Sequence, residues 1–158
     1  MQIDCQLFQQ INFIGGSMIA LMSLFFFLTA ASVCDLKSRR IPLLLLALSG
    51  SAGLLIFFMS HTMTPLEEVL GIILGGAFIS ISLISEGRFG IGDGLAILIA
   101  GIHLGGREAG FTCLYAMLMS AMFSVALLMI RRCSKNREVP FVPFLLAGLI
   151  LHEATVFL

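Results

Sequence analysis

The chain has 158 residues, of which 59% are hydrophobic and 11% are charged, and its mean hydropathy is +1.08. These values lie far outside those of soluble domains and exclude an ordinary water-soluble fold. We therefore predict an all-α integral membrane protein with a single membrane-embedded domain over residues 1–158. The formal net charge is zero, and we expect the lipid bilayer but no nucleic acid among its partners.

Six apolar segments predict a bundle of six transmembrane helices. In chain order they cover residues 11–34, 41–60, 66–85, 94–105, 109–130 and 140–157. A bilayer core of about 30 Å requires about 20 helical residues, so five segments are long enough or nearly so and the fourth is short. The start of the chain has no Lys or Arg before the first segment, so this segment lacks the basic region of a cleavable signal peptide and is expected to remain as a span.

Local signals predict where several helices begin. Residues 64–67 read Thr-Pro-Leu-Glu, which combines an N-cap hydroxyl, a proline at the first helical position and a capping-box glutamate before the third segment. Pro42 is expected to open the second helix in the same way, and Pro140 and Pro143 the sixth. The fourth begins in a glycine-rich stretch, so we expect residues 87–94 to border a cavity rather than lipid.

The distribution of basic residues predicts the orientation. All but one of the nine Lys and Arg residues lie in the breaks after the first, third and fifth segments, and the exception is Arg107. The positive-inside rule makes these breaks cytoplasmic and places both termini outside. We therefore expect a multi-pass protein of the cell inner (cytoplasmic) membrane, with Asp35 and Asp93 both at the cytoplasmic side.

Two pairs of glycines indicate close packing of helices. The third segment contains Gly71-x-x-x-Gly75 and the fourth contains Gly101-x-x-x-Gly105. Small residues at this spacing allow two backbones to approach each other in lipid. We interpret both motifs as packing within the bundle rather than as a dimerisation signal.

The two aspartates are the strongest candidates for a functional site. A charged residue at the centre of a span costs about 2.5–3.5 kcal/mol on insertion scales, and intramembrane acids usually mark a pathway or a site. Asp35 could instead pair at the interface with Lys37 or Arg39, and Asp93 could cap the fourth helix. The residues Gly90–Gly94 that surround Asp93 allow unusual backbone angles and close approach of another chain segment, which a capping role does not explain.

Two carboxyl groups at one depth can act as a pair. When they lie close together they share a proton, because like charges oppose the ionisation of both groups. The ionised member can then accept a proton from water while the protonated member donates to a peptide carbonyl. This chemistry fits hydrolysis of a peptide bond without a metal or a covalent intermediate, so we expect no cofactor.

Three motifs resemble those of the prepilin peptidases. Residues 35–42, Asp-Leu-Lys-Ser-Arg-Arg-Ile-Pro, resemble the D-x-x-x-x-x-I-P signature of that family, and residues 90–93, Gly-Ile-Gly-Asp, resemble its GxGD motif. Residues 139–145, Val-Pro-Phe-Val-Pro-Phe-Leu, resemble the stretch that opens its last helix. The resemblance implies an aspartic membrane endopeptidase that removes the basic leader of type IV prepilins or pseudopilins at the cytoplasmic membrane face. It implies that Asp35 and Asp93 are the catalytic pair.

Some family features are absent. Leu43 stands where an acid or amide often follows the Ile-Pro pair, and Gly94-Leu95-Ala96 lacks the usual lysine after the GxGD motif. The cysteines have no metal-ligand spacing, so we expect no zinc site and no methyltransferase region, as in the short, peptidase-only type. These cysteines are Cys5, Cys34, Cys113 and Cys133.

Several weaker candidates and two alternative functions stay open. Gly90, Gly92, Pro42 and Glu86 are predicted to support the motifs or to bind substrate. His103 could relay a proton, although a hydrogen-bonded structural histidine is the preferred interpretation. The alternatives to a peptidase are a catalytically silent homologue that serves as an assembly subunit of a pilus or secretion machine, and a small proton-coupled transporter.

Overall fold

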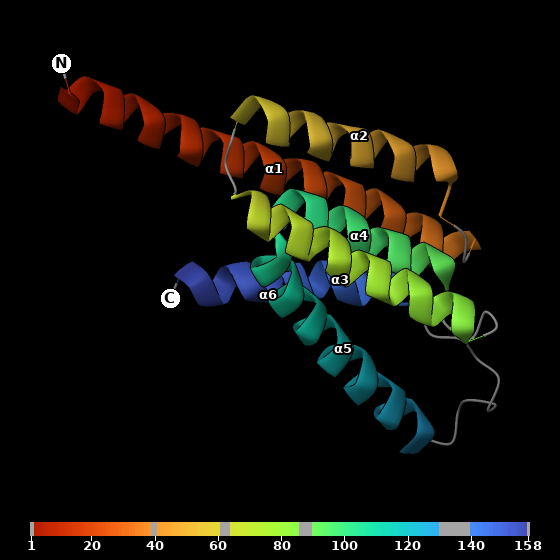
Figure 1. Cartoon of the computed structure of the whole chain (residues 1–158). Helices are drawn as coiled ribbons and strands as arrows, with labels where there is room; N and C mark the ends of the chain where they lie inside the picture. The colour runs from red at the N-terminus through yellow and green to blue at the C-terminus, as the bar shows by residue number, and fades with distance from the viewer. Residues whose placement is uncertain (1, 39–40, 61–63, 86–89, 130–139, 158) are drawn as a thin grey trace.

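The computed structural model describes residues 2–38, 41–60, 64–85, 90–129 and 140–157, which form six helices (Figure 1). The all-α prediction is confirmed for these residues, because none of them lies in a strand. The helices are α1 (Gln2–Ser38), α2 (Leu43–Ser60), α3 (Pro65–Ile84), α4 (Ile91–Leu104), α5 (Gly106–Met129) and α6 (Val142–Phe157).

The lengths of the helices support the membrane assignment only in part. Three stretches are long and apolar enough to cross a bilayer, namely Gly15–Ser38 of α1, the whole of α3 and the whole of α5. The apolar parts of α2, α4 and α6 are shorter. Each predicted segment therefore corresponds to a helix, but only three of the described helices meet the length of a span.

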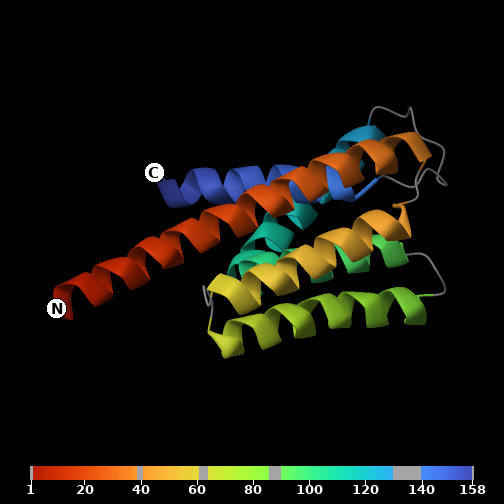
Figure 2. The ribbon, with the colours of Figure 1, turned by 90° about the horizontal axis from the view of Figure 1, so that it is seen from above.

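The helices alternate in direction along the chain. In Figures 1 and 2, α1, α3 and α5 end at the side of the bundle where α2, α4 and α6 begin. This is the arrangement that the spacing of the basic residues predicted. We call this side the acid end, because it contains Asp35 near the end of α1 and Asp93 at the beginning of α4.

Helix α4 lies at the centre of the fold. It packs against α1, α2, α3 and α5, and Ala96, Ile97, Ile99 and Ala100 are almost completely buried there. A helix covered by protein does not have to match the bilayer thickness, which explains why the central helix is also the shortest.

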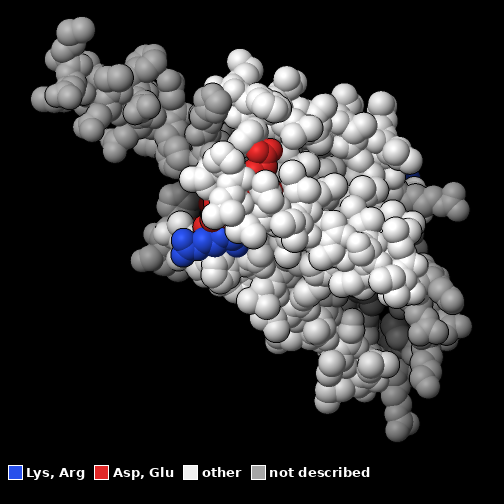
Figure 3. Space-filling view, viewed as in Figure 1, with Lys and Arg blue, Asp and Glu red and all other residues white. Residues whose placement is uncertain are grey.

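The outward faces of the surrounding helices are apolar. Phe26, Met59, Ile84 and Met129 are large hydrophobic residues that are each at least three-quarters exposed. Figure 3 shows one face of the molecule, on which the charged side chains occupy small patches and most of the described surface is uncharged. An apolar exterior of this kind suits a lipid environment.

The glycine pairs bring α3 and α4 into contact. A Cβ atom added to Gly71 would collide with the carbonyl oxygen of Gly101, and a Cβ atom on Gly101 would collide with that of Gly71. Gly75 lies equally close to Leu98. The interpretation of these motifs as packing within the bundle is confirmed at these positions.

Gly105 has a different role from the one that its motif suggested. It is the C-cap of α4 and has a φ of 80°, in the left-handed region that favours glycine. Its N–H donates to the carbonyl of Gly101 at 2.9 Å. Gly105 therefore ends α4, and the chain continues directly into α5.

The predicted start of α3 is confirmed. Thr64 is the N-cap, Pro65 is the first helical residue, and the Thr64 hydroxyl accepts a hydrogen bond from the N–H of Glu67 at 3.4 Å. The capping box is completed differently, because the Glu67 carboxylate accepts from the backbone N–H of Arg107 at 3.1 Å. Glu67 thus joins the start of α3 to the start of α5, at the opposite side of the bundle from the acid end.

The prolines before α2 and α6 lie close to the predicted positions. Helix α2 begins at Leu43, so the prediction that Pro42 is its first residue is wrong by one position. The Pro42 carbonyl instead accepts the first hydrogen bonds of the helix, at 3.0 and 3.3 Å. Pro143 lies in the first turn of α6, and Pro140 precedes that helix.

Candidate active site

Asp35 is held in the last turn of α1. The helix continues to Ser38, past the end that the apolar segment predicted, so helical backbone fixes the position of this acid. The Asp35 side chain is only 7% exposed, whereas Lys37 in the same turn is exposed. A buried carboxyl group next to an exposed lysine faces into the bundle. Arg39, the other predicted partner, lies outside the described residues.

Asp93 lies in the first turn of α4. The N-cap of this helix is Gly90, so the alternative in which Asp93 is the cap is wrong. The carboxyl group folds back over the start of the helix, and a Cβ atom on Gly90 would lie 3.0 Å from Oδ2 of Asp93.

The structure brings the two acids together from distant parts of the sequence. Helices α1 and α4 pack against each other, and Asp35 and Asp93 lie at the same end of the bundle. They are close enough for the charge of the Asp35 carboxylate to act on the carboxyl group of Asp93. The described residues therefore place two carboxyl groups within range of each other's charge.

The glycines around Asp93 create space for three different neighbours. Gly90 leaves room for the Asp93 carboxyl group itself. At Gly92 an added Cβ would lie 3.3 Å from Cδ1 of Ile41, and at Gly94 it would lie 3.1 Å from the backbone nitrogen of Ile79 on α3. Close approach is thus confirmed as the reason for the glycines.

Unusual backbone angles are not the reason. Gly90 has a φ of −63° and a ψ of 126°, which any residue adopts, and Gly105 is the glycine with positive φ among the described residues. The expectation of unusual angles around Asp93 is therefore wrong for the described glycines. Nothing in the sequence identified Ile41 as the neighbour of Gly92, although both residues belong to the recognised motifs.

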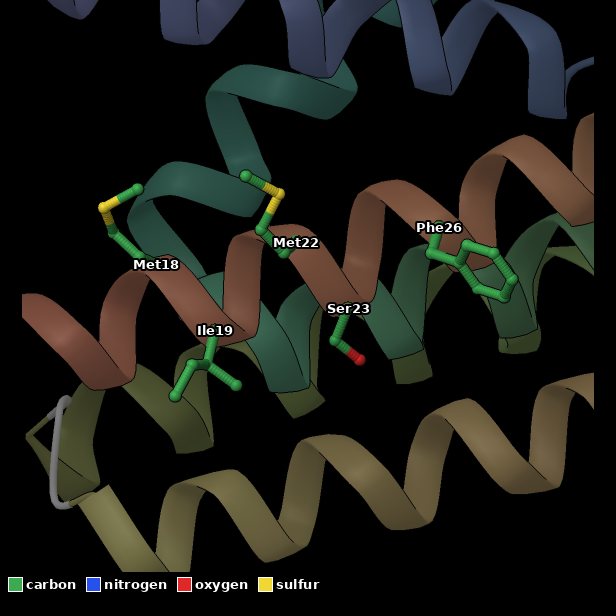
Figure 4. Close-up of a pocket in the computed structure, with 5 residues that line it drawn as sticks. All are labelled: Met18, Ile19, Met22, Ser23 and Phe26. Atoms are coloured by element: carbon green, nitrogen blue, oxygen red, sulfur yellow. The ribbon is translucent and has the colours of Figure 1, made fainter.

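An open groove of about 490 Å³ lies along α1 rather than at the acids. Its lining comes from one helix, with Met18 and Met22 extending to one side and Ile19 and Ser23 to the other (Figure 4). The cavity predicted beside residues 87–94 falls partly outside the described residues, as does Glu86.

His103 is a hydrogen-bonded structural residue. It lies in the last turn of α4, at the opposite end of that helix from Asp93, and it is 1% exposed. Nδ1 lies 3.0 Å from the carbonyl oxygen of Ile99, which can only accept, so Nδ1 carries the hydrogen. In the neutral ring Nε2 then accepts from the hydroxyl of Ser23 at 3.3 Å. The preferred structural interpretation of this histidine is confirmed.

The described cysteines do not form a metal site or a disulfide. Cys34 and Cys113 are free, and Cys113 is buried in the core. In the part of the chain that the structure describes, no group of three or more His, Cys, Asp or Glu residues is placed to hold a metal ion.

The fold and the acid pair define an all-helical membrane protein with a candidate two-aspartate site. Residues 22–128, which include both acids, match the type IV leader peptidase family. This match covers more than half of the chain, so the chain belongs to that family, and the resemblance drawn from the motifs is confirmed. No curated protein and no solved structure matches the chain.

Proposed function

We propose that this chain is a membrane aspartic endopeptidase that removes the basic leader of type IV prepilins, pseudopilins or related proteins. The observation that carries the proposal is the pairing of Asp35 and Asp93, which two packed helices bring to one end of the bundle. Membership of the type IV leader peptidase family supports a protease with a prepilin-like substrate.

The proposed topology has six spans in one domain, residues 1–158, with both termini outside and the acid end at the cytoplasmic face. Three helices are long enough to span the bilayer alone. The shorter helices cross in contact with their neighbours, since α4 is enclosed by four others. The basic residues that follow the first, third and fifth helices support a cytoplasmic acid end.

In the proposed mechanism the acid pair holds one proton. The ionised carboxylate takes a proton from a water molecule as the water oxygen attacks the peptide carbonyl carbon, and the protonated carboxyl group donates its proton to the carbonyl oxygen. The tetrahedral gem-diol then collapses: the ionised carboxylate takes a proton from one of its hydroxyl groups as the carbonyl reforms, the C–N bond breaks, and the protonated carboxyl group donates its proton to the leaving nitrogen. The acids end the cycle with the single proton with which they began.

The position of the acids suits a substrate with a basic leader and an apolar helix. The helix lies in the membrane and the leader stays in the cytoplasm, so the bond between them reaches the acid end. We include Glu86 in the proposal as a residue that attracts the basic leader, because it is an acidic residue four positions before the GxGD motif in the sequence.

The test is processing of a coexpressed prepilin with a basic leader, a glycine and an apolar helix. Asp35→Asn and Asp93→Asn keep the side-chain shape but cannot exchange the proton, so each is expected to reduce processing by at least about 100-fold. The cleaved and uncleaved substrate are separated on a gel, and the amount of each variant in the membrane is measured in parallel.

Glu67→Gln is the matched control. It makes the same acid-to-amide change at the opposite side of the bundle, and it is expected to process the substrate as the wild type does. Normal processing by either aspartate variant would refute the two-acid mechanism. A wild-type protein that is folded but processes no more than Asp93→Asn would favour the silent assembly subunit instead.

A further inference from the structure

Ile41 touches the glycine that directly precedes Asp93. A Cβ atom on Gly92 would lie 3.3 Å from Cδ1 and 3.7 Å from Cγ1 of Ile41. The first distance is tighter than ordinary van der Waals contact, and the second is ordinary contact. The space above Gly92 is therefore filled by the end of one isoleucine side chain.

Ile41 has little freedom to move away from this contact. Its side chain is partly buried and packs against the hydrophobic core of the bundle. It precedes Pro42, which restricts its backbone to extended conformations, and the Pro42 carbonyl accepts the first hydrogen bonds of α2. The backbone is thus fixed on the side of Ile41 that leads into α2.

The contact joins the start of α2 to the helix that carries Asp93. Ile41 follows the end of α1, which holds Asp35, and Gly92 lies in the first turn of α4 next to Asp93. A longer or shorter side chain at position 41 would shift the first turn of α4. That shift would change the distance between the carboxyl groups of Asp35 and Asp93.

We propose that Ile41 is a positioning residue for the acid pair, because its side chain sets the distance at which the first turn of α4 packs against the start of α2. Ile41 does not touch the reacting atoms. The role rests on the proposed function, and it assigns a physical purpose to the isoleucine of the first motif and to the second glycine of GxGD.

The other glycines of the motif differ in what they contact. An added Cβ on Gly94 meets Cγ1 of Ile79 at 3.0 Å and also the backbone nitrogen of Ile79 at 3.1 Å, which cannot rotate away, and an added Cβ on Gly90 meets the Asp93 carboxyl group itself. Only at Gly92 is the neighbour the end of a side chain that a second substitution can shorten. This makes the Gly92 contact testable by rescue.

The test compares Gly92→Ala, Ile41→Val and the double variant in a processing assay with purified protein in detergent. A displacement of about 1 Å in an active site costs about 100-fold in rate, so the shift of a few tenths of an ångström required by Gly92→Ala is expected to lower kcat about tenfold, with little change in KM. Ile41→Val removes Cδ1 and leaves Cγ1 in ordinary contact, so the double variant is expected to recover to within about threefold of the wild type.

Gly76→Ala on α3 is the matched control, since a Cβ atom at Gly76 meets nothing within 4 Å. Its activity is expected to equal that of the wild type, and its thermal unfolding in detergent is expected at the same temperature or somewhat higher, because alanine has the better helix propensity. Unchanged activity of Gly92→Ala would overturn the proposal, and so would a double variant as slow as Gly92→Ala, because the loss would then arise from another contact.

A second measurement does not depend on proteolysis. In a background without the native cysteines, Asp35→Cys and Asp93→Cys are oxidised to a disulfide, and the rate of cross-linking reports how closely the two positions approach. Gly92→Ala is expected to slow cross-linking and Ile41→Val to restore it. If the wild type does not process the substrate but the double-cysteine protein cross-links at the normal rate, the proposed function alone is refuted. If Gly92→Ala does not change the rate of cross-linking, the role of Ile41 is refuted.

Discussion

Replacing Gly71 with alanine places a methyl group against the backbone of α4. The new Cβ atom would lie 2.8 Å from the carbonyl carbon of Gly101 and closer still to its oxygen. Both neighbours are backbone atoms, so no side-chain rotation relieves the contact and α3 and α4 have to separate. Gly76→Ala in the same helix meets nothing within 4 Å and serves as the reference.

The difference between these two variants isolates the contact between the helices. Each substitution gains about 1 kcal/mol of helix propensity, so this term cancels in the comparison. Overpacking a tight site typically costs about 1–3 kcal/mol, and a rigid backbone neighbour favours the upper end of that range. We therefore expect Gly71→Ala to unfold with a free energy about 3 kcal/mol lower than Gly76→Ala, which is roughly 100-fold in the equilibrium constant.

The assay is reversible unfolding in mixed micelles with increasing sodium dodecyl sulfate. The chain has no Trp and a single Tyr, so circular dichroism is a better probe than intrinsic fluorescence. The double variant with alanine at Gly71 and Gly101 should lose less than the sum of the single losses, because both methyl groups press on the same crossing point. Equal stability of Gly71→Ala and Gly76→Ala would refute the close approach of α3 and α4, and strictly additive losses would show that the two glycines do not face each other.

Two further predictions concern polar contacts away from the acid end. Glu67→Ala removes the acceptor of the Arg107 N–H at the start of α5, and it is expected to lower the free energy of unfolding by about 0.5–2 kcal/mol, as for the loss of an N-cap. Glu67→Gln keeps an acceptor and should lose less stability. Equal losses in the two variants would contradict the capping role. Ser23→Ala and His103→Ala, combined in a double-mutant cycle, are expected to show a coupling of about 0.6 kcal/mol, as is typical of hydrogen bonds between membrane helices, and zero coupling would show that the Ser23 hydroxyl does not donate to His103.

The positions of the helices were predictable because they depend on local features of the chain. The length of each apolar run and the Thr64-Pro65 start of α3 placed α2 to α6 within a few residues of their bounds in the structure. Helix α1 is the main difference, since it begins at Gln2, nine residues before the apolar run, and continues through the polar residues that follow the run, with Asp35 inside its last turn. A helix ends where its hydrogen bonds end, and hydropathy does not report this.

The acids themselves were also evident from the sequence. A carboxylate beside an apolar run is costly wherever the helices pack, so Asp35 and Asp93 were conspicuous before any fold was known. The alternative in which Asp93 is the N-cap was wrong, because α4 begins earlier. Its N-cap is Gly90, which has an extended backbone and no side-chain hydrogen bond to the helix. Which residue caps a helix depends on where its first turn closes, and a glycine-rich stretch leaves several possible starting points.

The sequence by itself determined the membrane class, the all-helical fold, the alternating direction of the helices and the two acids. Only the tertiary structure decided that Gly71 faces Gly101, that Gly105 ends a helix, that Glu67 reaches α5, and that Ile41 fills the space above Gly92. The physical reason is that these contacts depend on the rotation and axial register of one helix against another. Register is fixed by the fit of all the packed side chains together, and no local pattern in the chain contains it.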